Sequence, residues 1–173
     1  MRNMKARNLI YILFVAVVFT SSGCDTYSDQ EVENSAIYPM SGEWLSHVYD
    51  ASGNAFGATP ANKAGSLFAL RTYNTTNNDA DKAWVKLGTT QAVALLGKVD
   101  VNLSEKAFIG QNISNQAKAG TTFNIIEGKV ILDAVKLPSG AVADSIYIKY
   151  STTVDGATYI VKGHRRTQWT DTE

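Results

Sequence analysis

Residues 145–165 read SIYIKYSTTVDGATYIVKGHR, two stretches of alternating apolar and polar residues on either side of a turn sequence. A period of two is typical of a strand with one buried face. Asp155-Gly156, between the two stretches, is a pair of residues that favours a tight β-turn. The sequence therefore predicts an antiparallel hairpin made of strands at 145–151 and 158–165.

Short runs of the same kind occur from residue 37 onward, separated by Gly, Asn, Asp and Pro. Further strands are expected at residues 43–49, 66–73, 83–87, 94–103, 107–109 and 123–135. The last run is either one long strand bent at Gly128 or two strands around a turn, and the polar stretch 111–121 is expected to be a loop. No segment after residue 23 has an apolar period of 3.6 over three turns. Seven to nine short strands predict an all-β protein, either an antiparallel meandering β-barrel or a sandwich.

The N-terminus has the pattern of an export signal. Arg2, Lys5 and Arg7 precede an uncharged apolar stretch at 9–19, and small residues follow up to Gly23. Eleven helical residues rise about 16 Å, well short of the ~30 Å hydrocarbon core of a bilayer. We therefore expect residues 1–23 to be a signal peptide and not a permanent membrane span.

Cys24 is the single cysteine of the chain, so it cannot form an internal disulfide. Ser21-Ser22-Gly23-Cys24 resembles the lipobox of bacterial lipoproteins, with Ser21 at a position where Leu is more usual, and looser lipoboxes are common in Bacteroidetes. The resemblance implies that the Cys24 thiol is acylated and becomes the mature N-terminus. The expected location is the cell envelope, as an outer-membrane lipoprotein on either the periplasmic or the surface-exposed face, with the membrane as a partner.

Removal of the signal peptide leaves 13 basic and 16 acidic residues, a net charge of −3. This charge argues against nucleic acid or an anionic membrane surface as the main partner. Residues 24–35 contain four acids and no Lys or Arg, which predicts a flexible tether. The acidic residues also resemble the surface-export signal of Bacteroidetes lipoproteins, and a plain polar linker is an equal alternative. Residues 36–173 are expected to form one domain.

Motifs for catalysis or metal binding are scarce. The two histidines, His47 and His164, could pair with a hydroxyl such as Ser46 or Ser145 and an acid such as Asp50, but no nucleophile elbow or zinc motif is present. We therefore expect no metal and no cofactor, and we assign no catalytic residue.

Aromatic residues occur on almost every expected strand. Trp44, Phe68 and Trp84, near the middle of three early strands, are the best candidates to line a ligand pocket, with Arg71 as a contact for a ligand headgroup. For each aromatic side chain, packing into the barrel core is the alternative. Lys86 is a second cationic candidate, and Arg165 with Arg166 could close one barrel end or contact a carboxylate.

The segment Tyr38-Pro39-Met40-Ser41-Gly42-Glu43-Trp44, after a lipoprotein signal and an acidic tether, resembles the start of the lipocalin-like Bacteroidetes lipoproteins described as lipid-binding putative hydrolases. Residues 131–134 and 157–169 are similar as well. The resemblance implies a calycin-like barrel that holds a small apolar ligand such as a lipid or fatty acid, and it transfers no catalytic residue. Two alternative hypotheses are an accessory glycan- or protein-binding component of a surface nutrient-uptake system, with envelope proteins as partners, and an envelope hydrolase.

Overall fold

The structure, a computed structural model, describes residues 33–88 and 91–167. Asn34–Glu173 form one compact unit. The described residues form eight strands: β1 Gly42–Asp50, β2 Leu67–Asn74, β3 Lys82–Leu87, β4 Leu95–Asn102, β5 Ala107–Ser114, β6 Thr122–Lys136, β7 Val142–Thr152 and β8 Thr158–Arg165. The predicted signal peptide, Cys24 and most of the tether lie outside the described residues.

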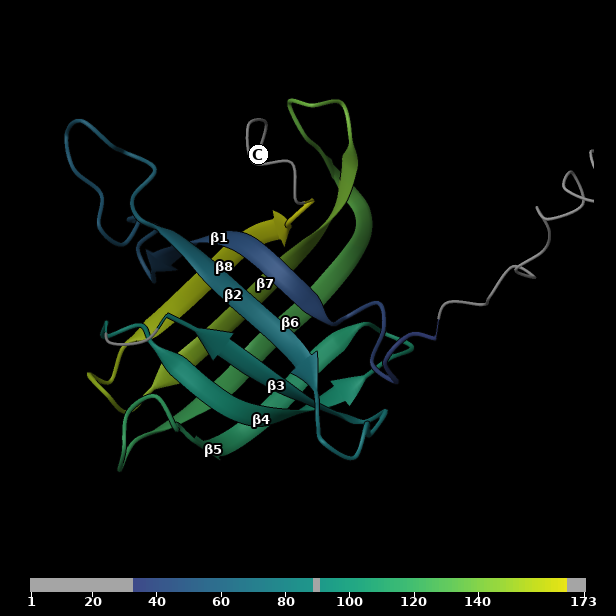
Figure 1. Ribbon diagram of the computed structural model, residues 1–173. Helices are drawn as coiled ribbons and strands as arrows, with labels where there is room; N and C mark the ends of the chain where they lie inside the picture. Colours follow the sequence, from purple (N-terminus) through teal and green to yellow (C-terminus); the bar gives the residue numbers. More distant parts are fainter. Residues whose placement is uncertain (1–32, 89–90, 168–173) are drawn as a thin grey trace, which may run out of the picture. The chain divides into compact units, whose positions relative to one another are not determined.

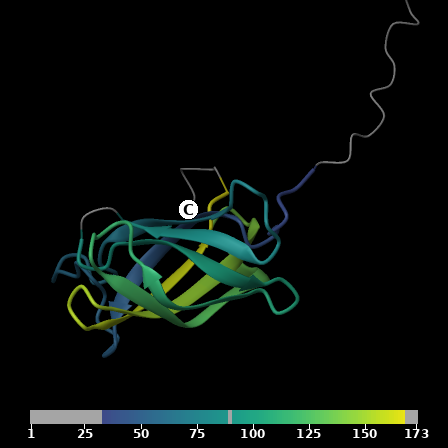
Figure 2. The ribbon, with the colours of Figure 1, turned by 90° about the horizontal axis from the view of Figure 1, so that it is seen from below.

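Each strand pairs with its neighbour in sequence, and β8 pairs antiparallel with β1 to close the barrel (Figure 1). The predicted all-β antiparallel barrel is therefore confirmed, and the hairpin that predicted it forms β7 and β8. Among the described residues, no helix is long and apolar enough to cross a membrane. Figure 2 shows the loops gathered at the two ends of the barrel.

One expected boundary was wrong, and one open alternative is decided by the structure. The predicted loop 111–121 is wrong for its first four residues, which continue β5 as far as Ser114. Register shifts against β6, and a hydrogen bond that the Asn112 N–H donates to the Asn124 side-chain oxygen, let this segment remain in the strand. The region around Gly128 is one continuous strand, which is one of the two predicted alternatives, with a register shift between Ile125 and Glu127. Glycine suits position 128 because a Cβ there would come within 2.8 Å of the Phe108 side chain of β5.

Large side chains fill the barrel interior. Alternate residues of every strand point inward, and Trp44, Phe108, Phe123 and Tyr150 are among the largest side chains that are fully buried. An eight-stranded barrel is just wide enough for side chains to fill it. The interior is therefore a packed core.

One barrel end is closed around Trp44 and Arg165. We call it the entry end, because the described chain enters β1 there. The Arg165 guanidinium lies 4.4 Å from the Trp44 ring, donates to the Asp144 carboxylate at 2.8 Å and to the Ser41 carbonyl at 2.6 Å, and also bonds the Pro39 carbonyl. The expected closing role of Arg165 is thus present in the structure.

The opposite end, which we call the rim, carries the β1–β2, β3–β4, β5–β6 and β7–β8 loops. The Tyr150 hydroxyl donates to the Val93 carbonyl at 2.6 Å, and burial raises the pKa of this phenol, so it remains a donor. The buried Asn115 side chain accepts from Leu96 N and donates to the Ala94 carbonyl. These bonds hold the β3–β4 loop against the core.

Candidate functional site

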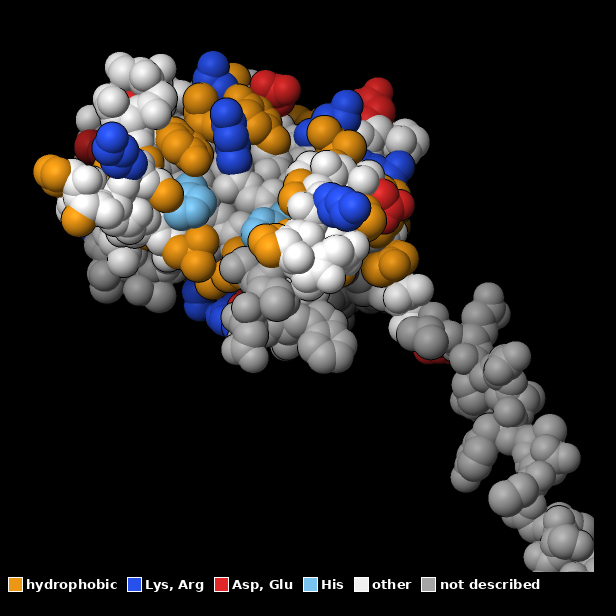
Figure 3. Space-filling view, turned by 90° about the horizontal axis from the view of Figure 1, so that it is seen from above, with side chains coloured by type: hydrophobic (Ala, Val, Ile, Leu, Met, Phe, Trp, Pro, Cys, Tyr) orange, Lys and Arg blue, Asp and Glu red, His pale blue; other side chains and the backbone are white. Residues whose placement is uncertain are grey.

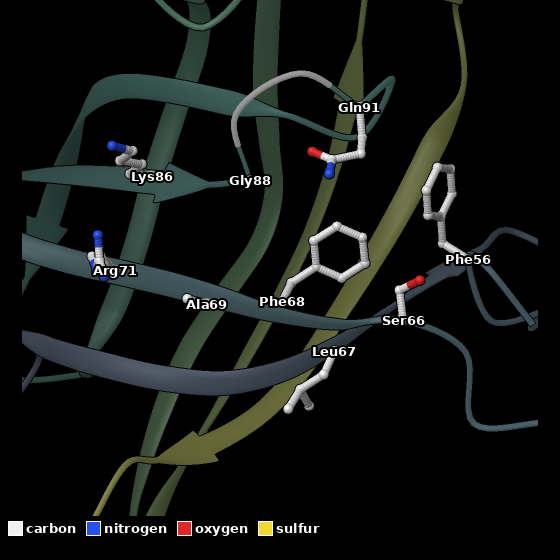
Figure 4. Close-up of a pocket in the computed structure, with 9 residues that line it drawn as sticks. All are labelled: Phe56, Ser66, Leu67, Phe68, Ala69, Arg71, Lys86, Gly88 and Gln91. Carbon is white, nitrogen blue, oxygen red and sulfur yellow. The ribbon is translucent and has the colours of Figure 1, made fainter. Parts of the chain in front are cut away.

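A hollow of about 410 Å³ lies at the rim, between β2 and the chain that leaves β3. It forms because β2 extends further toward the rim than β3 does. The pairing of the two strands ends at Leu70 and Leu87, so residues 67–69 of β2 have no partner on the β3 side. We call it the rim pocket. Its lining residues are Phe56, Ser66, Leu67, Phe68, Ala69, Arg71, Lys86, Gly88 and Gln91 (Figure 4).

One side of the rim pocket is apolar. Phe68 joins the core and the pocket, and its ring meets Phe56 edge to face with a centroid distance of 5.9 Å. Leu67 is 59% exposed beside them. The buried Ser46 hydroxyl donates to the Phe68 carbonyl at 3.0 Å, which fixes this part of β2. The pocket therefore offers an apolar surface on a rigid strand.

The other side is cationic. Arg71 and Lys86 are directly opposed across β2 and β3, and Figure 4 shows them at the end of the pocket away from Phe56. Arg71 Nε donates to Glu43 at 3.0 Å, and Glu43 also accepts from Arg166 at 2.8 Å. Hydrogen bonds from Arg166 and then Arg71 lower the pKa of Glu43, so its single charge is shared by two guanidinium groups. Positive charge therefore remains at this end for an anionic group.

The candidates from the sequence separate onto different faces. Phe68 and Arg71 come together in the rim pocket, with Lys86. Trp44 is fully buried in the core and donates to the Thr72 hydroxyl at 2.9 Å. Trp84 lies on the outer surface because its neighbours Ala83 and Val85 point inward. The structure does not bring the three aromatic candidates into one pocket.

Sequence reasoning missed Phe56 and Gln91, which belong to loops and have no periodic pattern. Asp50 organises the loop that carries Phe56 by accepting hydrogen bonds from Ser52 N, Asn54 N and the Asn54 side chain. The sequence indicates this turn, because Asp50 is followed by Gly53 and Asn54, residue types that favour turns. It does not indicate where the aromatic ring beyond the turn will lie.

The histidines do not form a catalytic group with the hydroxyls considered from sequence. His47 and His164 lie on one outer face (Figure 3), while Ser46 points into the core. In the part of the chain that the structure describes, no hydrogen bond joins either imidazole to a hydroxyl or a carboxylate, and His47 Nδ1 and His164 Nε2 are buried without a partner. The described residues also contain no cluster of three or more metal-ligating side chains.

These features define a small antiparallel barrel with a packed core and a ligand-sized pocket at its rim. A family profile described as "lipid-binding putative hydrolase" matches residues 29–170. The chain belongs to this family, and the predicted resemblance is confirmed.

One similar solved structure is a Bacteroides ovatus protein titled as a structural-genomics protein of unknown function. It matches with a TM-score of 0.46 and 12% identity, over 75% of this chain and 42% of that chain. The chain thus spans less than half the length of that protein. No match was found among curated proteins.

Proposed function

We propose that this protein binds a small amphipathic anion, such as a fatty acid, in the rim pocket. The observation that carries the proposal is the placement of Phe56, Leu67 and Phe68 beside Arg71 and Lys86 in one hollow. Ligand sites combine an apolar lining with a few polar groups that orient the ligand. The lipid-binding family supports the same class of ligand.

The volume and charge of the pocket set the expected affinity. About 410 Å³ accommodates a short acyl chain with its headgroup. Burial of about 150 Å² of apolar ligand surface contributes ~4 kcal/mol. A charge-assisted hydrogen bond to a cation adds about 1.5–3 kcal/mol. The sum corresponds to a Kd on the order of 10–100 µM.

We also propose that the domain is held at the cell envelope by acylated Cys24, as an outer-membrane lipoprotein. The basic start, apolar stretch and small residues before Cys24 support export and acylation. Two or more acyl chains give stable anchoring where one is marginal. The rim pocket lies at the barrel end opposite the one at which the described chain enters β1.

The test is isothermal titration of dodecanoate into the full mature chain carrying Cys24→Ser, which cannot be acylated. Binding in the micromolar range is expected, with at least a tenfold loss in an Arg71→Gln/Lys86→Gln double variant. Lys98→Gln, on the outer surface outside the rim pocket, is the matched control and should leave the Kd unchanged. Equal affinity of all three proteins, or equal affinity for neutral dodecanol, would rule out the proposed headgroup contact.

A second candidate function is glycan binding on the outer face. Tyr73 and Trp84 stack with a centroid distance of 6.4 Å, and Trp84 borders a hollow of about 560 Å³ with Gln111 and Gln116. Aromatic rings beside amide groups suit a sugar, and this site would serve the accessory role in nutrient uptake. Titration with oligosaccharides discriminates between the two functions, since Trp84→Ala would abolish glycan binding while the Arg71/Lys86 variant would not.

A further inference from the structure

Exposed apolar side chains concentrate at the entry end. The eight large exposed hydrophobic side chains of the described residues include only one at the rim, Leu67, and one in mid-strand, Ile126. The other six lie in the half of the barrel nearest the entry end: Tyr38, Tyr73, Ile109, Ile131, Leu132 and Val142. Single exposed apolar side chains are ordinary on a protein surface, so an interaction site requires apolar neighbours that lie together.

The β6–β7 hairpin projects from this end (Figure 1). The neighbouring strands β5 and β8 stop short of its tip. On the β5 side, the last hydrogen bond runs from Val130 N to the Lys106 carbonyl, and on the β8 side the pairing ends at Ser145 and His164. A register shift after Ile131 places Ile131 and Leu132, consecutive residues, both at the surface, 51% and 39% exposed. The bulge thus presents two adjacent apolar side chains where a regular strand would present one.

Cationic groups flank these side chains. A hollow of about 330 Å³ is lined by Ile131, Leu132, Lys106, Lys129 and a single acid, Glu105, together with Val130. Within the described residues, neither lysine forms an ion pair. Two ammonium groups above an apolar surface match the phosphate and upper acyl region of a phospholipid.

The tether keeps this end close to a bilayer. Nine residues, 25–33, lie between Cys24 and Asn34, which makes ten Cα-to-Cα steps. A flexible chain of that length has a root-mean-square extension of about 18 Å and a maximum of about 35 Å. These lengths are comparable to the ~14 Å radius of gyration of a 140-residue domain. A tether of this length therefore lets the entry end, where the described chain begins, reach the membrane surface.

We propose that the entry end docks on the bilayer that holds the Cys24 acyl chains, with Ile131, Leu132 and Val142 in the interfacial layer and Lys106 and Lys129 at lipid phosphates. The inference rests on the proposed anchoring at Cys24. Docking would orient the rim pocket away from the membrane, toward incoming ligand.

The test uses the acylated mature protein in vesicles of phosphatidylethanolamine and phosphatidylglycerol. Because Cys24 is the single cysteine and acylation consumes its thiol, Leu132→Cys introduces a unique site for bimane. Lys63→Cys, exposed in the β1–β2 loop at the rim, is the matched control. At position 132, we expect brominated lipids to quench the label and iodide quenching to fall at least threefold relative to a Cys24→Ser protein in solution. Neither change is expected at position 63.

Each other outcome overturns the proposal in a distinguishable way. Equal iodide quenching at position 132 in both proteins, with acylation verified by mass, would mean that the domain stands away from the bilayer. Protection from iodide without quenching by brominated lipids would indicate self-association. Absence of acylation would remove the anchor itself, while leaving dodecanoate binding in the rim pocket as a separate question.

Discussion

Replacement of Arg165 by Met should open the entry end of the barrel. The substitution leaves the Asp144 carboxylate, whose side chain is 17% exposed, and the Ser41 and Pro39 carbonyls without their donor. Breaking a largely buried ion pair costs about 3–5 kcal/mol, and loss of the cation above Trp44 contributes about 1–2 kcal/mol when desolvated. Because these contributions overlap, we expect a total loss of about 4 kcal/mol in the free energy of unfolding.

Urea denaturation followed by tryptophan fluorescence measures this loss. With a slope near 2 kcal/mol per molar urea, the midpoint of Arg165→Met should fall by about 2 M. The midpoint of Arg165→Lys should fall about half as far, because lysine keeps the charge but lacks the planar guanidinium. Lys82→Gln is the control, because its ion pair with Asp100 is exposed and is worth under ~1 kcal/mol. A midpoint shift for Arg165→Met no larger than that of the control would refute the closing role of Arg165.

Three further changes test other parts of the barrel. Glu43 has a lowered pKa, so its contribution to stability is present above the ordinary value of 4.5 and is lost as pH falls through the lower folded value. Glu43→Gln should therefore reduce the loss of unfolding free energy on acidification, and the same loss as in the unsubstituted protein would contradict this. Gly163→Ala places a Cβ 2.3 Å from the Leu45 carbonyl oxygen and should lower the free energy of unfolding by about 1–3 kcal/mol, measured by thermal denaturation. An unchanged free energy of unfolding would show that β1 and β8 move apart at little cost. Tyr150→Phe leaves the Val93 carbonyl without its donor and should cost about 1–2 kcal/mol, with faster amide exchange in the β3–β4 loop; unchanged exchange would argue against that bond.

The strand pattern could be predicted because burial of one face imposes a period of two on the sequence. The turn of the β7–β8 hairpin and the bounds of β8 were predicted correctly, since Asp155-Gly156 sets the turn, but β7 begins three residues before the predicted start, at Val142. The length of β5 was not predicted, because its outer half depends on bulges against β6 and on Asn124, which a single strand's pattern does not contain.

The site was predictable only in part. Phe68 and Arg71 were predicted as candidate ligand contacts and lie together in the rim pocket, but the prediction also grouped them with Trp44 and Trp84. Strand register decides which face each ring occupies: Trp44 is inward on β1, and Trp84 is outward on β3. A shift of one residue reverses the face, and the expected strand bounds were not precise enough to fix it.

The central claim is that an amphipathic anion binds at the rim pocket. A fatty acid that carries a photoreactive diazirine in its chain tests this directly, with the crosslinked peptides of the full mature Cys24→Ser chain mapped by mass spectrometry. We expect adducts on Phe56 and Leu67 that unlabelled dodecanoate competes away. Adducts confined to the outer face around Trp84, or labelling that dodecanoate does not reduce, would contradict it.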